Sequence, residues 1–330
     1  METKVIQNDK QLTKIMRKIK YFPITSFAAI MGLSGYTILL SKLYHMRLIP
    51  EMPFNVMLFF TLFMFGICVL GYGLKSAFFY EEVKKDYNHK IRINFSATFS
   101  ISLLLLSIAL MGKYPIASLN FWILGVVIHT ILLFKILNKW ITHDFDIHHF
   151  NPAWYIPVVG AILIPVAGVN FINKTFLLFY LATGLFFWII LTSILLYRLI
   201  FHDELPEKLK PTFFIIVAPP AVGFISYMRL FSSWDFISQS LIMMTYFFVI
   251  LIYTLRSKFK KMNFFMSWWA FVFPLASVSI ASFVAFMVTK KNLYYYAIIG
   301  FSVITTIITL LVLYNTFKNI IKGNICVKED

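Results

Sequence analysis

Charged residues are scarce in this chain, and acidic residues are the scarcest of them. Of its 330 residues only 13% are charged, with 14 Asp and Glu against 30 Lys and Arg, whereas 60% are hydrophobic. Soluble proteins carry roughly 25% charged residues, because most of their surface faces water. The composition therefore excludes a soluble fold and predicts an integral membrane protein whose outer face contacts the lipid bilayer.

The net charge of +16 could indicate a nucleic acid partner. However, the Lys and Arg residues lie almost wholly in the connections between apolar segments. That is the distribution which the positive-inside rule requires of a membrane protein. We therefore predict no nucleic acid partner.

Cysteine is almost absent, and no metal-site pattern is recognisable. Cys68 lies inside an apolar segment and Cys326 near the C-terminus, so we expect neither a disulfide nor a metal site from them. A cluster of metal-ligating residue types precedes the fifth apolar segment, but its order matches no zinc spacing. It consists of His143, Asp144, Asp146, His148 and His149. We predict no metal and no cofactor.

Ten apolar segments are long enough to cross a bilayer, at about 20 residues for each helical span. They lie at residues 23–41, 54–80, 93–112, 121–141, 152–171, 175–201, 211–228, 236–255, 264–289 and 293–317. Helices satisfy their own backbone hydrogen bonds in lipid, so we predict an all-α membrane protein. The connections after odd segments are mostly short, which predicts five helical hairpins.

The predicted organisation has three parts. Residues 1–22 form a cytoplasmic N-terminal segment without the apolar core of a signal peptide, residues 23–317 a ten-helix pore domain, and residues 318–330 a cytoplasmic tail. Of the 30 Lys and Arg residues, 23 lie on the side of the two termini and 7 on the other. The positive-inside rule therefore predicts a multi-pass protein of the cell (inner) membrane with both termini in the cytoplasm.

Proline is unevenly distributed between the two classes of segment. The even segments contain none, whereas four of the five odd segments hold or begin with proline. Proline bends a helix, which a bilayer tolerates where protein or water compensates. We predict an inner ring of odd helices around a pore and an outer ring of even helices, although proline is also simply common in membrane helices. The predicted kinks are at Pro157, Pro165, Pro219, Pro220 and Pro274.

The odd segments contain no charged residue and no histidine, but they carry small hydroxyl side chains. Hydroxyls can bond a passing anion weakly enough to let it leave, as conduction requires. The alternative is that these hydroxyls pack helices together. The candidates for lining a pore are Ser34, Ser96, Ser100, Ser107 and Ser277.

No Asp or Glu lies within any of the ten segments. Proton-driven transporters and cation pathways normally need carboxylates inside the membrane, so their absence favours a passive route for small inorganic anions. The alternative is a secondary transporter or exporter of dicarboxylate, sulfite or tellurite-type oxyanions. A membrane-embedded enzyme is a weaker alternative, because paired intramembrane His or Asp residues are missing, and we predict no enzymatic activity.

Six short blocks of sequence form a series that spans nearly the whole chain. They lie at residues 22–27, 31–35, 79–87, 151–157, 217–222 and 268–274. In order and spacing they resemble the family of the tellurite-resistance protein TehA, the plant guard-cell slow anion channels and the related dicarboxylate and sulfite exporters. One departure is Met31, which stands near the place where TehA-like first spans often have a kinking proline, so the bend of that helix is not carried over.

The resemblance implies a homotrimer in which each protomer has its own pore, lined by five inner helices and surrounded by five outer ones. It also implies that a phenylalanine of the ninth span plugs the pore. By position that residue is Phe273, which directly precedes Pro274, with Phe271 as the alternative. Together with the charge-free odd segments, this predicts an anion channel or exporter for small monovalent anions.

Overall fold

The computed structural model describes residues 13–259 and 262–328, which form helices and no strands. Nine helices in this part of the chain are long and apolar enough to cross a membrane. They are α3 (Ser26–His45), α4 (Glu51–Phe78), α6–α7 (Arg92–Leu110), α8 (Pro115–Thr142), α11 (Lys174–Phe201), η4–α12 (Glu207–Phe231), α13 (Phe236–Thr254), η6–α14 (Met266–Thr289) and α15 (Asn292–Ile321). This confirms the predicted all-α membrane fold.

The fifth apolar segment is shorter and broken, so the described residues hold nine full-length spans rather than the expected ten. It covers Pro152–Gly168 and consists of η2 (Pro152–Trp154), α9 (Tyr155–Val159), η3 (Gly160–Leu163) and α10 (Ile164–Gly168). Pro157 lies in α9 and Pro165 in α10. Because proline has no backbone N–H and its ring crowds the preceding turn, a continuous α-helix is disfavoured along this segment.

Burial divides the helices into two rings. In the apolar stretches of α3, α6–α7, η4–α12 and η6–α14, 67% to 83% of the residues are buried, whereas in α4, α8, α11, α13 and α15 the share is 28% to 33%. The segment from α9 to α10 belongs with the first group, because nearly all of its residues are buried. The odd segments therefore form the predicted inner ring. The outer ring exposes large apolar side chains, as a lipid-facing surface requires.

The helices extend beyond the apolar segments, and their ends hold proline and charge that the segments themselves lack. α4 contains Pro53 and α8 begins at Pro115, so the outer helices do hold proline, within their first turn. Proline is tolerated there because the first N–H groups of a helix have no partner within it. α3 and α12 run on to include Lys42 and Arg229, so the inner helices are not free of charge. Long cationic side chains permit this, since their charged ends can reach water.

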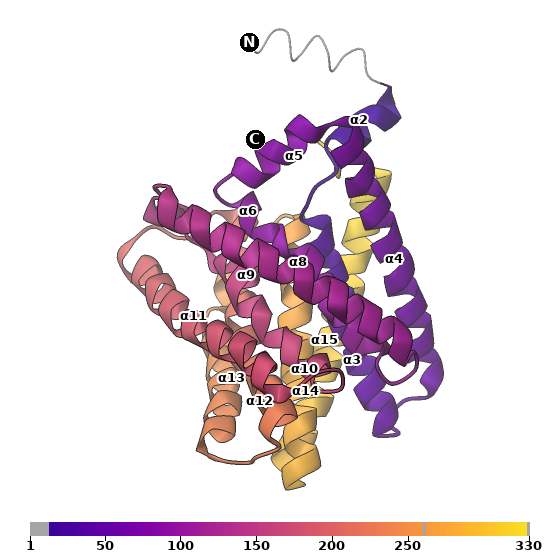
Figure 1. Cartoon of the computed structure of the whole chain (residues 1–330), viewed down its shortest axis with the longest axis vertical. Coiled ribbons are helices and arrows are strands. Elements are labelled where there is room, and N and C mark those ends of the chain that lie inside the picture. The colour runs from indigo at the N-terminus through magenta and orange to yellow at the C-terminus, as the bar shows by residue number, and fades with distance from the viewer. Residues whose placement is uncertain (1–12, 260–261, 329–330) are drawn as a thin grey trace.

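One end of the bundle gathers α2 (Lys14–Lys20), α5 (Tyr80–Asn88) and the C-terminal segment, residues 322–328 (Figure 1). Asp86 of α5 accepts a hydrogen bond from Lys75 of α4 at 2.5 Å and another from Arg92 of α6 (Arg92–Phe95) at 3.1 Å. The side chains of Asp86 and Lys75 are only 8% and 4% exposed. A carboxylate this buried needs charged partners, so the cluster fastens α5 to the ends of two spanning segments.

Candidate functional site

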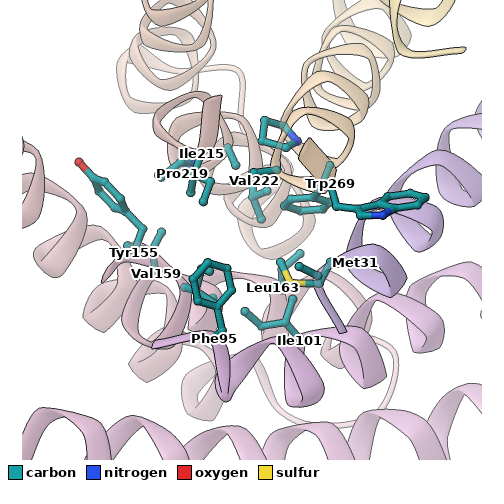
Figure 2. Close-up of a pocket in the computed structure, with 17 residues that line it drawn as sticks. Met31, Phe95, Ile101, Tyr155, Val159, Leu163, Ile215, Pro219, Val222 and Trp269 are labelled. Carbon is teal, nitrogen blue, oxygen red and sulfur yellow. The ribbon is translucent and has the colours of Figure 1, made fainter. Parts of the chain in front are cut away.

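A cavity of about 70 Å³ lies between the inner helices, and each of the five inner segments contributes to its wall (Figure 2). None of its 17 lining residues is charged. The polar groups of Tyr155 and Trp269 point away, since they donate to Thr192 of α11 at 2.9 Å and to Thr316 of α15 at 3.1 Å. The cavity is therefore apolar. Wall residues from the five segments include Met31, Ile101, Leu163, Val222 and Phe273.

The inner helices change geometry beside this cavity. η4 (Glu207–Val217) passes into α12 (Ala218–Phe231) just before Pro219 and Pro220, and η6 (Met266–Phe271) passes into α14 (Val272–Thr289) just before Pro274. Proline cannot continue the hydrogen-bond ladder of a helix, but it is well tolerated in the first turn. Pro219 and Pro274 themselves line the cavity, so two of the expected kink positions lie in its wall.

The two candidate gate residues face different directions. Phe273 lines the cavity, and its ring packs so closely on α3 that a Cβ atom at Gly35 would lie 2.8 Å from its Cδ2. Glycine at position 35 makes this approach possible. Phe271 is 8% exposed and packs edge-to-face on Phe214, with ring centroids 4.7 Å apart, without lining the cavity. The geometry thus distinguishes two phenylalanines that sequence position alone leaves as alternatives.

A larger cavity of about 610 Å³, here called the vestibule, adjoins the apolar cavity at the end of the bundle that holds the C-terminal segment. The two cavities share the wall residues Ala28, Phe95 and Ala270. Basic side chains line the vestibule, and its wall holds no Asp or Glu among residues 13–259 and 262–328. They are His89, Arg92, Lys208 and Lys328.

Helix α3 contacts the vestibule, the apolar cavity and Phe273, so its residues give the order of these three features. Ala28 borders both the vestibule and the apolar cavity, Met31 borders only the apolar cavity, and Gly35 contacts Phe273. A basic vestibule, an apolar cavity and a phenyl ring therefore follow one another between the inner helices.

A family model described as voltage-dependent anion channel, SLAC1, matches residues 21–317. The chain belongs to the SLAC1 family. The match includes every segment that lines the apolar cavity, and it confirms the resemblance inferred from the six sequence blocks.

Relatives of this SLAC1-family chain include proteins from archaea, plants and bacteria. An uncharacterized transporter of Methanocaldococcus jannaschii is 27% identical over an alignment of 301 positions, which covers 80% of this chain and 84% of the relative. The S-type anion channel SLAH3 of Arabidopsis thaliana is 27% identical over an alignment of 326 positions, which covers 94% of this chain and 50% of the plant protein. A TehA homolog of Haemophilus influenzae, named a tellurite resistance protein, is 26% identical over an alignment of 219 positions, which covers 64% of this chain and 65% of that protein.

The serines proposed to line a pore in this SLAC1-family chain lie outside the wall of the apolar cavity. Ser100 bonds His129 of α8 at 2.9 Å, and Ser107 bonds Ser118 of α8 at 3.1 Å. Both hydroxyls therefore join an inner helix to an outer one, as the packing alternative expects. Ser96 and Ser277 donate to backbone carbonyls three residues earlier, at 2.6 Å and 2.7 Å. These four hydroxyls are already engaged, which leaves them poorly placed to bond an ion.

Ser34 differs from the other four serines. Its side chain is fully buried in α3, next to Gly35, and its hydroxyl has no hydrogen-bond partner among the described residues. Ser226 of α12 and Ser279 of α14 are buried and unpartnered in the same way, and the sequence analysis did not single them out. Unbonded buried hydroxyls are rare because they lose water without compensation. Ser34 thus stays a candidate for contact with an ion.

Apart from Phe273, Pro219 and Pro274, the apolar wall residues were not predicted from the sequence, because polar side chains were expected to line the pore. Trp269 is the clearest case: it lines the cavity, and its Cε3 would lie 2.8 Å from a Cβ atom at Gly32. The sequence does not show that Trp269 and Gly32 lie on facing helices. Their close contact could therefore not be predicted from it. Over the part of the chain that the structure describes, no group of three or more metal-ligating side chains is assembled.

Proposed function

We propose that the protein is a channel for small monovalent anions, and that Phe273 closes the pathway of each protomer. The observation that carries this proposal is the apolar, uncharged cavity to which all five inner segments contribute, with the ring of Phe273 in its wall and a basic vestibule beside it. The S-type anion channels among its relatives support the same assignment.

The charge distribution favours anions. Among the described residues that line the vestibule, those that can carry charge near neutral pH are basic, which raises the local concentration of negative ions. Beyond it, the apolar cavity offers an ion neither a counter-charge nor a free hydrogen-bond donor. Removing an ion from water without compensation is costly, and more so for two charges than for one. Monovalent anions that dehydrate easily should therefore pass better than dicarboxylates.

The selectivity proposal is tested by reversal potentials of the purified protein in planar bilayers. We expect chloride and nitrate to carry current with weak discrimination, and malate and succinate to carry little. The same preparation reconstituted in vesicles with a pH gradient is the control for coupled transport. Robust proton-coupled uptake of malate or succinate would overturn the channel proposal and favour a secondary transporter.

We also propose a cell-membrane homotrimer with both chain ends in the cytoplasm. The orientation is supported by α2, α5 and the C-terminal segment, which share the end of the bundle where most Lys and Arg residues lie (Figure 1). The test is a cysteine introduced into residues 81–92 and an impermeant reagent applied to intact cells. If the reagent labels this cysteine, the proposed orientation is wrong. The trimer rests on the family resemblance, and its test is the mass of the purified protein in detergent.

A further inference from the structure

Two cations lie on the pore-facing stripe of the inner helices, beyond Phe273. Lys42 follows Gly35 by seven residues on α3, and Arg229 follows the wall residue Val222 by seven residues on α12. Seven residues are about two turns, so each cation lies on nearly the same helix face, roughly 10 Å farther along. Since the vestibule is at the other end, Lys42 and Arg229 lie at the opposite, outer end of the proposed pathway.

The surroundings of Arg229 hold its guanidinium in place but leave part of it free. Its Nε donates to the carbonyl of Val166 at 3.0 Å, and its Nη2 donates to Oδ1 of Asn170 at 3.1 Å. The amide of Asn170 also contacts Sδ of Met111, which directly follows α7. The Nη1 group of Arg229 has no partner among the described residues.

Lys42 is even less engaged. Its Nζ lies 5.7 Å from the ring centroid of Phe283 on α14 and makes no hydrogen bond or ion pair within the described chain. Three ammonium donors are therefore available on a half-buried side chain. Each of the five inner segments thus contributes one residue at this end of the inner ring: Lys42, Met111, Asn170, Arg229 and Phe283.

Neither cation has an ion-pair partner among the described residues. Both lie at the outer end of the inner ring, where the positive charge of Arg229 acts unfavourably on that of Lys42. The acidic residues described at the same end pair with neither cation: Glu51 pairs with Lys113 at 2.8 Å, and Asp235 accepts hydrogen bonds from Tyr227 and Ser238. Two partly buried like charges are unfavourable together unless an opposite charge lies between them.

We propose that Lys42 and Arg229 form a binding site for a small monovalent anion, such as chloride or nitrate, at the outer end of the pathway. The Lys42 ammonium and Nη1 of Arg229 supply the donors, and the anion neutralises their repulsion. The role of this site in permeation rests on the proposed channel function. Binding itself does not, because it follows from the donors and charges alone.

Binding is tested without conduction, by the melting temperature of the purified protein in increasing nitrate at constant ionic strength, with gluconate as the replacing anion. A ligand that binds only the folded state raises the melting temperature. We expect nitrate to raise the melting temperature of wild type and of Lys42→Arg. This rise should be largely lost in Lys42→Gln. Lys291→Gln, which removes an exposed cation at the same end, is the matched control and should behave as wild type. Equal rises in Lys42→Gln and wild type would overturn the site.

Permeation is tested in the Phe273→Ala background, with chloride varied on the outer side only. Removing one of two focusing charges should lower the chloride current that enters from that side, on the order of 3- to 10-fold at low chloride, because charged mouths raise local ion concentration by at least that factor. Lys42→Gln should show this loss, and Lys42→Arg and Lys291→Gln should not. An unchanged current in Lys42→Gln would contradict the role in permeation. Absence of anion current in every Phe273→Ala variant would instead refute the channel function and leave the nitrate result to decide the site.

Discussion

Asp86 stands at the point where α4, α5 and α6 meet, buried between Lys75 and Arg92. Tyr72 adds a third donor at 3.4 Å. Both cations of such a cluster depend on the carboxylate between them, because the buried ions have lost much of their water. Asp86 is the single acidic residue of this cluster, so the position of α5 beside the vestibule depends on its charge.

Asp86→Asn should therefore destabilise the protein strongly, by about 3–5 kcal/mol if values from soluble proteins apply, since two cations would lose their partner. The matched control is Glu82→Gln on the same helix, which removes a pair with the exposed Lys85 and should cost less than about 1 kcal/mol. Melting temperatures of the two purified variants measure the difference. Equal losses would show that the buried cluster contributes no more than the pair of Glu82 and Lys85.

At this scale the sequence predicts residue type better than direction. Phe273 and Phe271 are both apolar neighbours of Pro274, and only the three-dimensional packing shows that one lines the cavity while the other contacts Phe214. Likewise, the hydroxyls of Ser100 and Ser107 face the outer helix α8. Which way a side chain points depends on helix rotation, and an apolar segment that is buried on all sides does not specify its rotation.

Among the helices, α13 has the best-defined beginning. Asp235 accepts from the backbone N–H of Ser238 and from the hydroxyl of Tyr227, and Ser238 bonds back to the backbone N–H of Asp235. This is a capping box, which satisfies two otherwise free N–H groups. The Tyr227 hydroxyl and then the Ser238 N–H lower the pKa of Asp235 to about 2.

The lowered pKa of Asp235 predicts a pH dependence with a definite sign. A carboxylate whose pKa is lower in the folded state stabilises fully above its unfolded pKa, near 4, and loses that effect as the pH falls toward 2. Asp235→Ala should therefore lower the melting temperature at pH 7, and the deficit should shrink between pH 4 and pH 3. The exposed Asp144→Ala is the control and should show little change. A deficit that is the same at pH 7 and pH 3 would contradict the charge-based account.

The sequence largely predicts which segments form spanning helices, but it does not predict the residues at which those helices begin and end. Long apolar segments indicate nine of the spans, because lipid tolerates few charges. Proline correctly indicated that the fifth segment departs from a continuous helix. The ends were missed where Lys42, Glu51 and Arg229 extend a helix past its apolar part, since hydropathy ends before the helix does.

Across the whole molecule, the inner helices arrange three kinds of surface in series. A basic vestibule adjoins an apolar cavity with Phe273 in its wall, and Lys42 and Arg229 lie beyond it. Apolar constrictions exclude water, and an ion without its hydration shell meets a high barrier there. The vestibule and the two outer cations would concentrate anions on both sides of that barrier. In the proposed resting state, anions therefore gather at both ends of the pathway, and the apolar cavity between them holds no water.

The central claim is that Phe273 closes an anion pathway, and the most direct test is the anion current of Phe273→Ala in bilayers at matched protein abundance. Removing the phenyl ring should raise the current roughly tenfold or more, because each 1.36 kcal/mol taken from a barrier gives a factor of ten. The current of Phe273→Leu should lie between those of wild type and Phe273→Ala, because leucine is smaller than phenylalanine. Phe271→Ala, which alters a buried ring outside the cavity wall, is the matched control and should not conduct more than wild type. A Phe273→Ala current no larger than that of wild type, at equal abundance, would contradict the account.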